Sequence, residues 1–123
     1  MPLQIDQSQQ KDVAQVRLIG ELDTTTSPQL APLIEQLQAS PPSVLVLNLK
    51  DLVYISSAGL RYVFQMKKLM KAHGGRFVIS EPSPQVKKVF EIVKAVPVQS
   101  VFASTAELDD YLDKMQRQVS DQD

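Results

Sequence analysis

Two adjacent serines, Ser56 and Ser57, are the residues whose type and position best suit chemistry in this chain. They follow an apolar run, Val44–Leu49, that is typical of a strand buried on both faces, and they precede a stretch of helical composition, Leu60–Ala72. A hydroxyl at a helix start can accept a hydrogen bond from the free backbone N–H groups there, and it faces the positive end of the helix dipole. Such a position suits a covalently attached phosphate.

Catalysis by either serine would need a nearby base, and the sequence supplies none. The residues around Ser57 do not form the Gly-x-Ser-x-Gly motif of a nucleophile elbow. The only histidine, His73, lies about 16 residues further along the same predicted helix, or roughly 24 Å away at 1.5 Å per residue. His73 is better explained as a residue at the helix C-terminus, so we expect that the chain is not an enzyme.

Metal and cofactor sites are also not expected from the composition. The chain has no cysteine and one histidine, which leaves no ligand set for a protein-only zinc site. Its four glycines form neither a Walker A motif nor a Gly-x-Gly-x-x-Gly motif, so we expect no nucleotide bound through those loops.

Size and charge restrict the class of protein further. The chain has 123 residues, of which 43% are hydrophobic and 22% are charged, as in a soluble domain with one core. The formal net charge of -1 gives no basic field for binding nucleic acid. No run approaches the roughly 20 apolar residues of a membrane-spanning helix, and the N-terminus lacks the features of a secretory signal. We therefore expect no nucleic-acid or membrane partner and a cytoplasmic location.

Strands and helices are expected to alternate along the chain. Alternating apolar residues predict an N-terminal hairpin, Ser-Pro pairs at Ser27 and Ser83 mark helix starts, and Gly74 suits a helix end. Ser104 with Glu107 forms a capping box before the last helix. The pattern predicts strands over 3–10, 13–22, 44–49, 76–80 and 96–102, and helices over 27–37, 60–72, 83–93 and 104–115.

This order predicts an α/β fold with crossover connections, a largely parallel sheet and helices that cover it. Ligands and modifications gather at the carboxyl ends of strands in such sheets, which is where Ser57 lies. We expect one domain over residues 1–115, followed by a polar tail over 116–123 that frays. A purely structural interpretation remains open, in which Ser57, or Ser56 if the boundary shifts by one residue, only caps the helix. Asp23 is likewise explained as a loop residue or a cap.

Two segments together resemble the STAS domain of bacterial anti-sigma factor antagonists. They are Leu18–Asp23, with the sequence LIGELD, and Val46–Leu60, which contains both serines. The similarity extends from about residue 3 to residue 115, with further support from Gly75–Ser80 and Ser83–Phe90. The resemblance implies a single STAS-like domain with a mixed, mostly parallel sheet of about five strands and about four helices.

The resemblance also implies functional residues. The phosphorylated serine of the family corresponds to Ser57, and the aspartate that often precedes it is replaced by Ser56, which is the alternative acceptor. A second serine that often follows is replaced by Ala58, and the family glycine is Gly59. Asp23 corresponds to the family acid beside the acceptor. Gly59 and Asp23 are therefore expected to support the phosphorylation site.

The implied partners are an anti-sigma factor that is itself an ATP-dependent serine kinase and a PP2C-type phosphatase that reverses the modification. The unphosphorylated chain, a monomer when free, would bind the kinase and be released on phosphorylation. An alternative is a STAS regulatory or scaffold subunit, stressosome-like or transporter-associated, that phosphorylation does not control.

The helix after Ser57 suggests a surface for the partner. At 100° per residue, its core face contains Gly59, Tyr62, Val63, Met66, Leu69 and Met70. Leu60 and Phe64 fall beside that face, next to Lys67, Lys68 and Lys71. We expect Leu60 and Phe64 to bind the partner, with packing at the edge of the core as the alternative.

Overall fold

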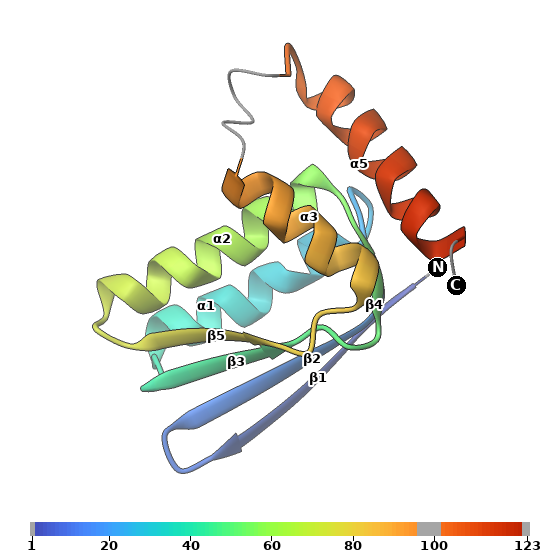
Figure 1. Cartoon of the computed structure of the whole chain (residues 1–123). Helices are drawn as coiled ribbons and strands as arrows, with labels where there is room; N and C mark the ends of the chain where they lie inside the picture. The colour runs from blue at the N-terminus through green and yellow to red at the C-terminus, as the bar shows by residue number, and fades with distance from the viewer. Residues whose placement is uncertain (1, 96–101, 122–123) are drawn as a thin grey trace.

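The computed structural model describes residues 2–95 and 102–121 (Figure 1). They form a five-stranded mixed sheet and four α-helices, as predicted. The elements are β1 (Leu3–Gln10), β2 (Val13–Leu22), the 3-10 helix η1 (Ser27–Leu30), α1 (Ala31–Ala39), β3 (Val44–Asn48), β4 (Leu52–Ile55), α2 (Ser57–Ala72), β5 (Arg76–Ser80), α3 (Pro84–Ala95) and α5 (Thr105–Asp121). Among these residues, no helix is both long and apolar enough to cross a membrane.

The sheet is built around the long strand β2. It pairs antiparallel with β1 in the predicted hairpin, and the two-residue turn contains Lys11 at φ 55°. Its other neighbours, β3 and β4, run parallel to it, and β5 pairs parallel with β3. The main path of the sheet is therefore β1-β2-β3-β5, with β4 beside β2 only.

The chain leaves the sheet after β3 and re-enters it as a separate strand, β4. β3 pairs with β2 from Val13 to Arg17, and β4 pairs with β2 from Gly20 to Leu22 after a shift of register. The prediction of one strand over 44–49 missed β4, because the apolar residues Leu49 and Leu52 continue the pattern of the run. The strand expected over 96–102 lies, apart from Phe102, outside the described residues.

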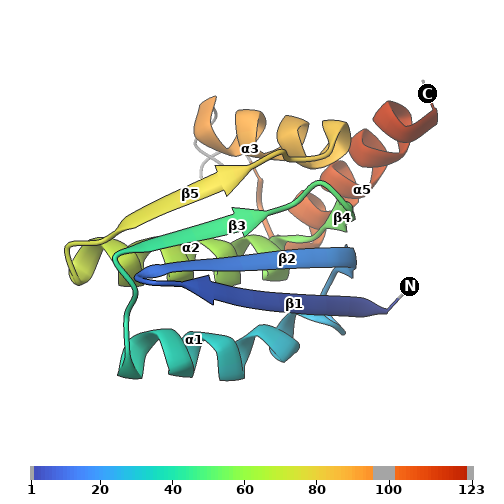
Figure 2. The same ribbon diagram turned by 90° about the horizontal axis from the view of Figure 1, so that it is seen from below.

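The described helices lie on one side of the sheet, and no described helix covers the other side, which we call the open side (Figures 1 and 2). In β3, Leu45 and Leu47 are fully buried toward the helices, whereas Val44 and Val46 are only half-buried. The interpretation of this run as a strand buried on both faces is therefore wrong. Fully buried side chains of the core come from every layer of the fold. They include Leu18, Leu22, Leu30, Leu45, Leu47, Leu49, Leu52, Ile55, Val63, Met66, Met70, Val86, Val89 and Leu112.

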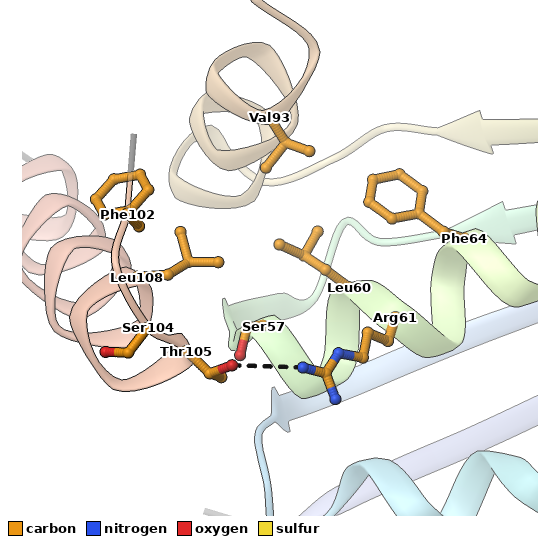
Figure 3. Close-up of a pocket in the computed structure, with 9 residues that line it drawn as sticks. All are labelled: Ser57, Leu60, Arg61, Phe64, Val93, Phe102, Ser104, Thr105 and Leu108. Atoms are coloured by element: carbon orange, nitrogen blue, oxygen red, sulfur yellow. Dashed lines mark hydrogen bonds between the residues drawn. The ribbon is translucent and has the colours of Figure 1, made fainter. Parts of the chain in front are cut away.

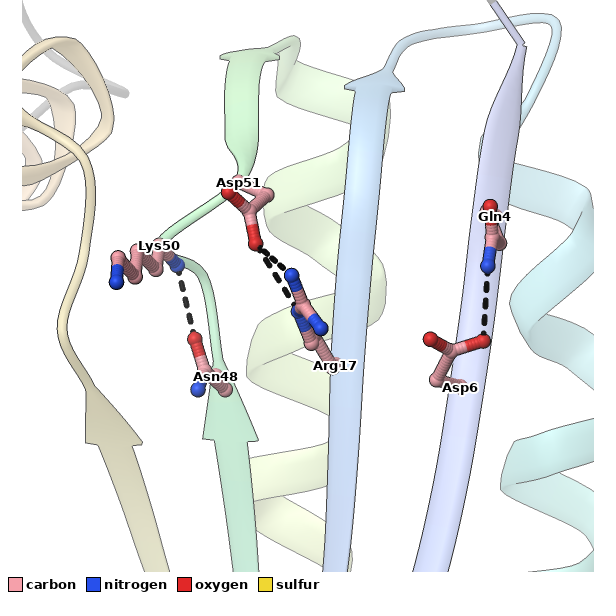
Figure 4. Close-up of polar contacts among 6 residues, drawn as sticks. All are labelled: Gln4, Asp6, Arg17, Asn48, Lys50 and Asp51. Atoms are coloured by element: carbon pink, nitrogen blue, oxygen red, sulfur yellow. Dashed lines mark hydrogen bonds and ion pairs between the residues drawn. The ribbon is translucent and has the colours of Figure 1, made fainter.

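The open side of the sheet carries polar contacts that hold the connection between β3 and β4 (Figure 4). Arg17 of β2 forms an ion pair with Asp51, and its Nε donates a hydrogen bond to Asp51 Oδ2 at 3.0 Å. The Asn48 side chain accepts a hydrogen bond from the Lys50 backbone N–H at 3.0 Å. These contacts fix the chain where it leaves β3 and enters β4.

The last helix extends beyond its predicted end. The expectation that the chain frays from residue 116 is wrong over the described residues, because α5 continues to Asp121. Gln116 is 2% exposed and lies in the interior beside β4. A domain boundary at residue 115 stays a prediction.

Gly20 lies at the register shift in β2, and we expect that the fold requires a glycine there because the chain before β1 passes close to it. It has φ 109°, and a Cβ atom there would lie 2.1 Å from the backbone oxygen of Pro2. We expect Gly20→Ala to lower the free energy of unfolding by more than the roughly 1–3 kcal/mol of backbone strain alone. The control is Gly74→Ala, where φ is 71° but no atom lies within 4 Å of the added Cβ. Equal losses in chemical denaturation would contradict this assignment.

Candidate functional site at the start of α2

Ser56 is the N-cap of α2. Its backbone is extended, its Oγ accepts a hydrogen bond from the Gly59 N–H at 3.2 Å, and its own N–H donates to the Leu22 carbonyl oxygen at 2.9 Å. The residue is 3% exposed. The interpretation of Ser57 as the cap is therefore wrong, and the alternative with a boundary shifted by one residue is confirmed. Both polar groups of Ser56 serve the local structure.

Ser57 is the first residue of α2 and is bound by a carboxylate from a distant helix. Its backbone N–H donates to Asp109 Oδ1 at 2.8 Å, and its Oγ donates to Asp109 Oδ2 at 2.9 Å. Asp109 lies near the start of α5, and Ser57 is only 6% exposed beneath it. An acidic group therefore already occupies the positive end of the α2 dipole.

Gln116 attaches α5 to the same junction through a second contact. Its side-chain amide accepts a hydrogen bond from the Ile55 N–H at 2.9 Å and donates one to the Ile55 carbonyl oxygen at 2.8 Å. Ile55 is the last residue of β4, so this amide satisfies both backbone groups at the end of the strand. Sequence reasoning missed Asp109 and Gln116, because polar residues beside the apolar stripe of an amphipathic helix look like surface residues.

Gly59 allows α2 to pack closely on β2. A Cβ atom at this position would lie 2.8 Å from Leu22 Cγ and 2.9 Å from the Leu22 carbonyl oxygen. The absence of a side chain thus brings the first turn of α2 against the end of β2. This contact gives a physical reason for a glycine two residues after Ser57.

Asp23 follows Leu22 and organises the loop after β2. Its carboxylate accepts hydrogen bonds from the backbone N–H groups of Thr25 and Thr26, both at 2.9 Å. In the described structure the Ser57 hydroxyl donates to Asp109 rather than to Asp23. A role of Asp23 in supporting a phosphorylated Ser57 stays a prediction.

The phenol of Tyr54, in β4, lies near several acidic side chains. Partial burial raises the pKa of Tyr54 above its ordinary value, and the carboxylates of Asp113, Asp109, Asp23 and Glu21 raise it further. Tyr54 therefore lies among several carboxylates at this end of the sheet.

An open apolar cavity of about 390 Å³ separates α2, α3 and the start of α5 (Figure 3). The guanidinium of Arg61 lies at this cavity and reaches Thr105 Oγ1 at 3.5 Å. The residues that line this cavity are Ser57, Leu60, Arg61, Phe64, Val93, Phe102, Ser104, Thr105 and Leu108. Ser57 therefore lies at the inner end of a gap between helices.

The two residues expected to bind a partner differ in exposure. Leu60 is 4% exposed and belongs to the core, whereas Phe64 is 40% exposed and contacts the Phe90 ring edge-to-face at 6.5 Å between centroids. Phe64 also lines a second cavity of about 420 Å³, together with Lys67 and Lys94. Within residues 2–95 and 102–121, no cluster of three acidic, histidine or cysteine side chains is suited to hold a metal ion.

A mixed sheet of five strands with four α-helices is the arrangement that the resemblance to STAS domains implied, and the two serines lie where β4 meets α2. Residues 4–108 match the sequence profile of the STAS domain, and the chain belongs to this family. The resemblance noted from the sequence is thus confirmed.

Similar proteins are anti-sigma factor antagonists. The anti-sigma F factor antagonist of Paenibacillus polymyxa is 31% identical over 102 residues, which cover 80% of this chain and 87% of that protein. The anti-sigma-B factor antagonist of Bacillus subtilis is 30% identical over 96 residues, which cover 75% and 84% of the two chains.

Two solved structures of the anti-sigma factor antagonist SpoIIAA of Bacillus have the same fold. The unphosphorylated form matches with a TM-score of 0.60 and 26% identity, over 72% of this chain and 81% of that one. The phosphorylated form matches with a TM-score of 0.62 and 25% identity, over 74% and 82%. The chain is thus similar to regulators of sigma factors.

The raised pKa of Tyr54 predicts how stability changes at alkaline pH. The unfolded chain loses the phenolic proton near pH 10, before the folded chain does, so the folded state loses stability as pH rises from about 10 through the raised pKa. Below about pH 10 both states keep the proton and this loss is absent. We expect Tyr54→Phe to lose less stability than the wild type between about pH 9 and pH 11.5, measured by urea denaturation. Parallel losses in the two proteins would contradict the assignment.

Proposed function

We propose that this chain is an anti-sigma factor antagonist that acts by partner switching. The unphosphorylated chain binds an anti-sigma factor with serine-kinase activity, and phosphorylation of Ser57 releases it. The observation that carries the proposal is the position of the Ser57 hydroxyl, on the first residue of α2, where the helix dipole favours an added negative charge. The names of the relatives, and the existence of SpoIIAA in both phosphorylation states, support it.

Ser57 is a better acceptor than Ser56 on structural grounds. The Ser56 hydroxyl lies inside the first turn of α2, where it caps the Gly59 N–H, so its phosphorylation requires that the turn open. Losing such a cap costs about 1 kcal/mol of stability. The Ser57 hydroxyl is held from outside the helix by Asp109, so it becomes accessible without unwinding α2.

The transfer step follows the chemistry of a serine kinase. Ser57 Oγ forms a bond to the γ-phosphorus of ATP, the bond from that phosphorus to the bridging oxygen breaks, and ADP leaves. The hydroxyl proton passes to a base of the kinase. The product carries a charge of about -1.5 to -2 near neutral pH. In an interface with acidic or apolar partner groups that charge weakens the complex, so the switch is local repulsion rather than refolding.

The chain acts as a substrate and not as an enzyme in this proposal. Its lone histidine, His73, is the C-cap of α2, at the opposite end of the helix from Ser57. A PP2C-type phosphatase would restore the hydroxyl, and the free chain would be a cytoplasmic monomer.

One observation favours the alternative of a STAS regulatory or scaffold subunit without phosphorylation. Ser57 is 6% exposed, and both of its polar groups already have a partner in Asp109. Under this alternative, the serine only connects α2 to α5.

Phosphorylation is tested by incubating the purified chain with Mg-ATP and each candidate serine kinase of the source organism, followed by mass spectrometry. We expect one phosphate on Ser57 in the wild type and in Ser56→Ala, and none in Ser57→Ala. Ser57→Asp should bind the same kinase at least 10-fold more weakly than the wild type. A kinase that binds the chain tightly but modifies neither serine would instead support the scaffold alternative.

Phe64 is expected to contribute to binding more than to folding. Because it is 40% exposed, Phe64→Ala should lower the free energy of unfolding by about 1 kcal/mol or less and weaken kinase binding by about tenfold or more. The matched variant Leu60→Ala removes a side chain that is 4% exposed and should cost about 2–5 kcal/mol of stability. Isothermal titration and thermal unfolding of both variants measure the two effects. A loss in Tm as large as that of Leu60→Ala, with unchanged affinity, would assign Phe64 to the core.

A further inference from the structure

Asp109 lies directly against the hydroxyl that a reacting phosphate must reach. In-line transfer requires the γ-phosphorus within about 3–3.5 Å of Ser57 Oγ. The Asp109 carboxylate already lies 2.9 Å from that oxygen, and it carries the same sign of charge as ATP. The carboxylate therefore covers the hydroxyl and would repel an approaching γ-phosphate.

The two ends of α5 are held very differently. Toward the C-terminal end, Leu112 is fully buried, Met115 is buried, and Gln116 is joined to Ile55 by two hydrogen bonds. At the start of the helix, Thr105 is exposed and the cavity of about 390 Å³ separates it from α2 and α3 (Figure 3). The paired hydrogen bonds of Asp109 are thus the main polar attachment of this end to α2.

From these contacts we infer that α5 is a built-in shield over Ser57, held closed by Asp109, and that its first half must lift before a kinase can reach the hydroxyl. The inference rests on the proposed function of Ser57 and adds a regulation of that same site. Both Asp109 and Gln116 lie after residue 108, where the match to the family profile ends.

A phosphate on Ser57 would also keep the shield open. It places a charge of about -1.5 to -2 against the carboxylate of Asp109, in surroundings where Tyr54 already faces several acids. Arg61 lies one turn along α2, and in the closed form it reaches Thr105 of α5. Released from Thr105, its guanidinium can pair with the phosphate, since residues four apart on a helix lie side by side.

The first arm of the test needs no kinase. Hydrogen exchange of the full chain, followed by mass spectrometry, compares the wild type with Asp109→Ala. The matched control is Asp110→Ala, which removes an exposed carboxylate that pairs with Lys114 on the same helix. We expect exchange over residues 105–111 to be roughly 10-fold or more faster in Asp109→Ala, because hydrogen bonds to a charged group are lost. The control should match the wild type. Unchanged exchange in Asp109→Ala would overturn the inference whether or not Ser57 is phosphorylated.

The second arm measures the initial rate of phosphorylation of Ser57 with Mg-ATP and a kinase that modifies the wild type. We expect Asp109→Ala to react at least fivefold faster and Asp110→Ala to react at the wild-type rate. A slower reaction would mean that Asp109 assists as a base or positions the hydroxyl, and an equal rate would mean that the shield does not limit access; either result overturns the inference. If no kinase modifies any form, the proposed phosphorylation fails, while the exchange data still decide whether Asp109 holds α5.

Discussion

The strand β2 pairs with two strands, β3 and β4, along the same edge, and the structure around Ser57 depends on this constraint. β3 pairs with its first half and β4 with its last residues, and the register shifts beside Gly20. This shift aligns the end of β4 with Leu22. The carbonyl oxygen of Leu22 accepts a hydrogen bond from the Ser56 N–H, and Leu22 packs against Gly59. The direction of α2 is thereby set by β2, and the first residue of α2 comes to lie at the end of the sheet.

The end of β4 and the start of α2 lie next to each other, so several backbone N–H and C=O groups there need hydrogen-bond partners. Ser56 supplies the one local partner, by capping the Gly59 N–H. Asp109 and Gln116 come from a helix more than 50 residues later in the chain and satisfy the N–H of Ser57 and both polar groups of Ile55. Since a buried polar group without a partner costs about 1–3 kcal/mol, these bonds give α5 a defined position that its apolar stripe alone would not fix.

Features that depend on neighbours in the sequence were predictable, and features that depend on distant contacts were not. The hairpin and the helix end at Gly74 follow from alternation and turn chemistry, and the structure has them where they were expected. β4 was missed, because Leu49 and Leu52 are both apolar and hide a break that is visible only in the pairing with β2. Asp109 could not be assigned to the site from the sequence, since its contact with Ser57 depends on where α5 packs.

The same electrostatics would account for both the closed arrangement at the start of α2 and the proposed open one. The positive end of the helix dipole, together with the N–H of Ser57, favours one anionic group, and the Asp109 carboxylate fills that place in the unmodified chain. A phosphate on Ser57 would be covalently attached to α2 and could not move away from it. Repulsion would therefore displace Asp109, together with the start of α5. In the regulation proposed above, control of the serine would reside in the docking of one helix end and would leave the sheet and the core unchanged.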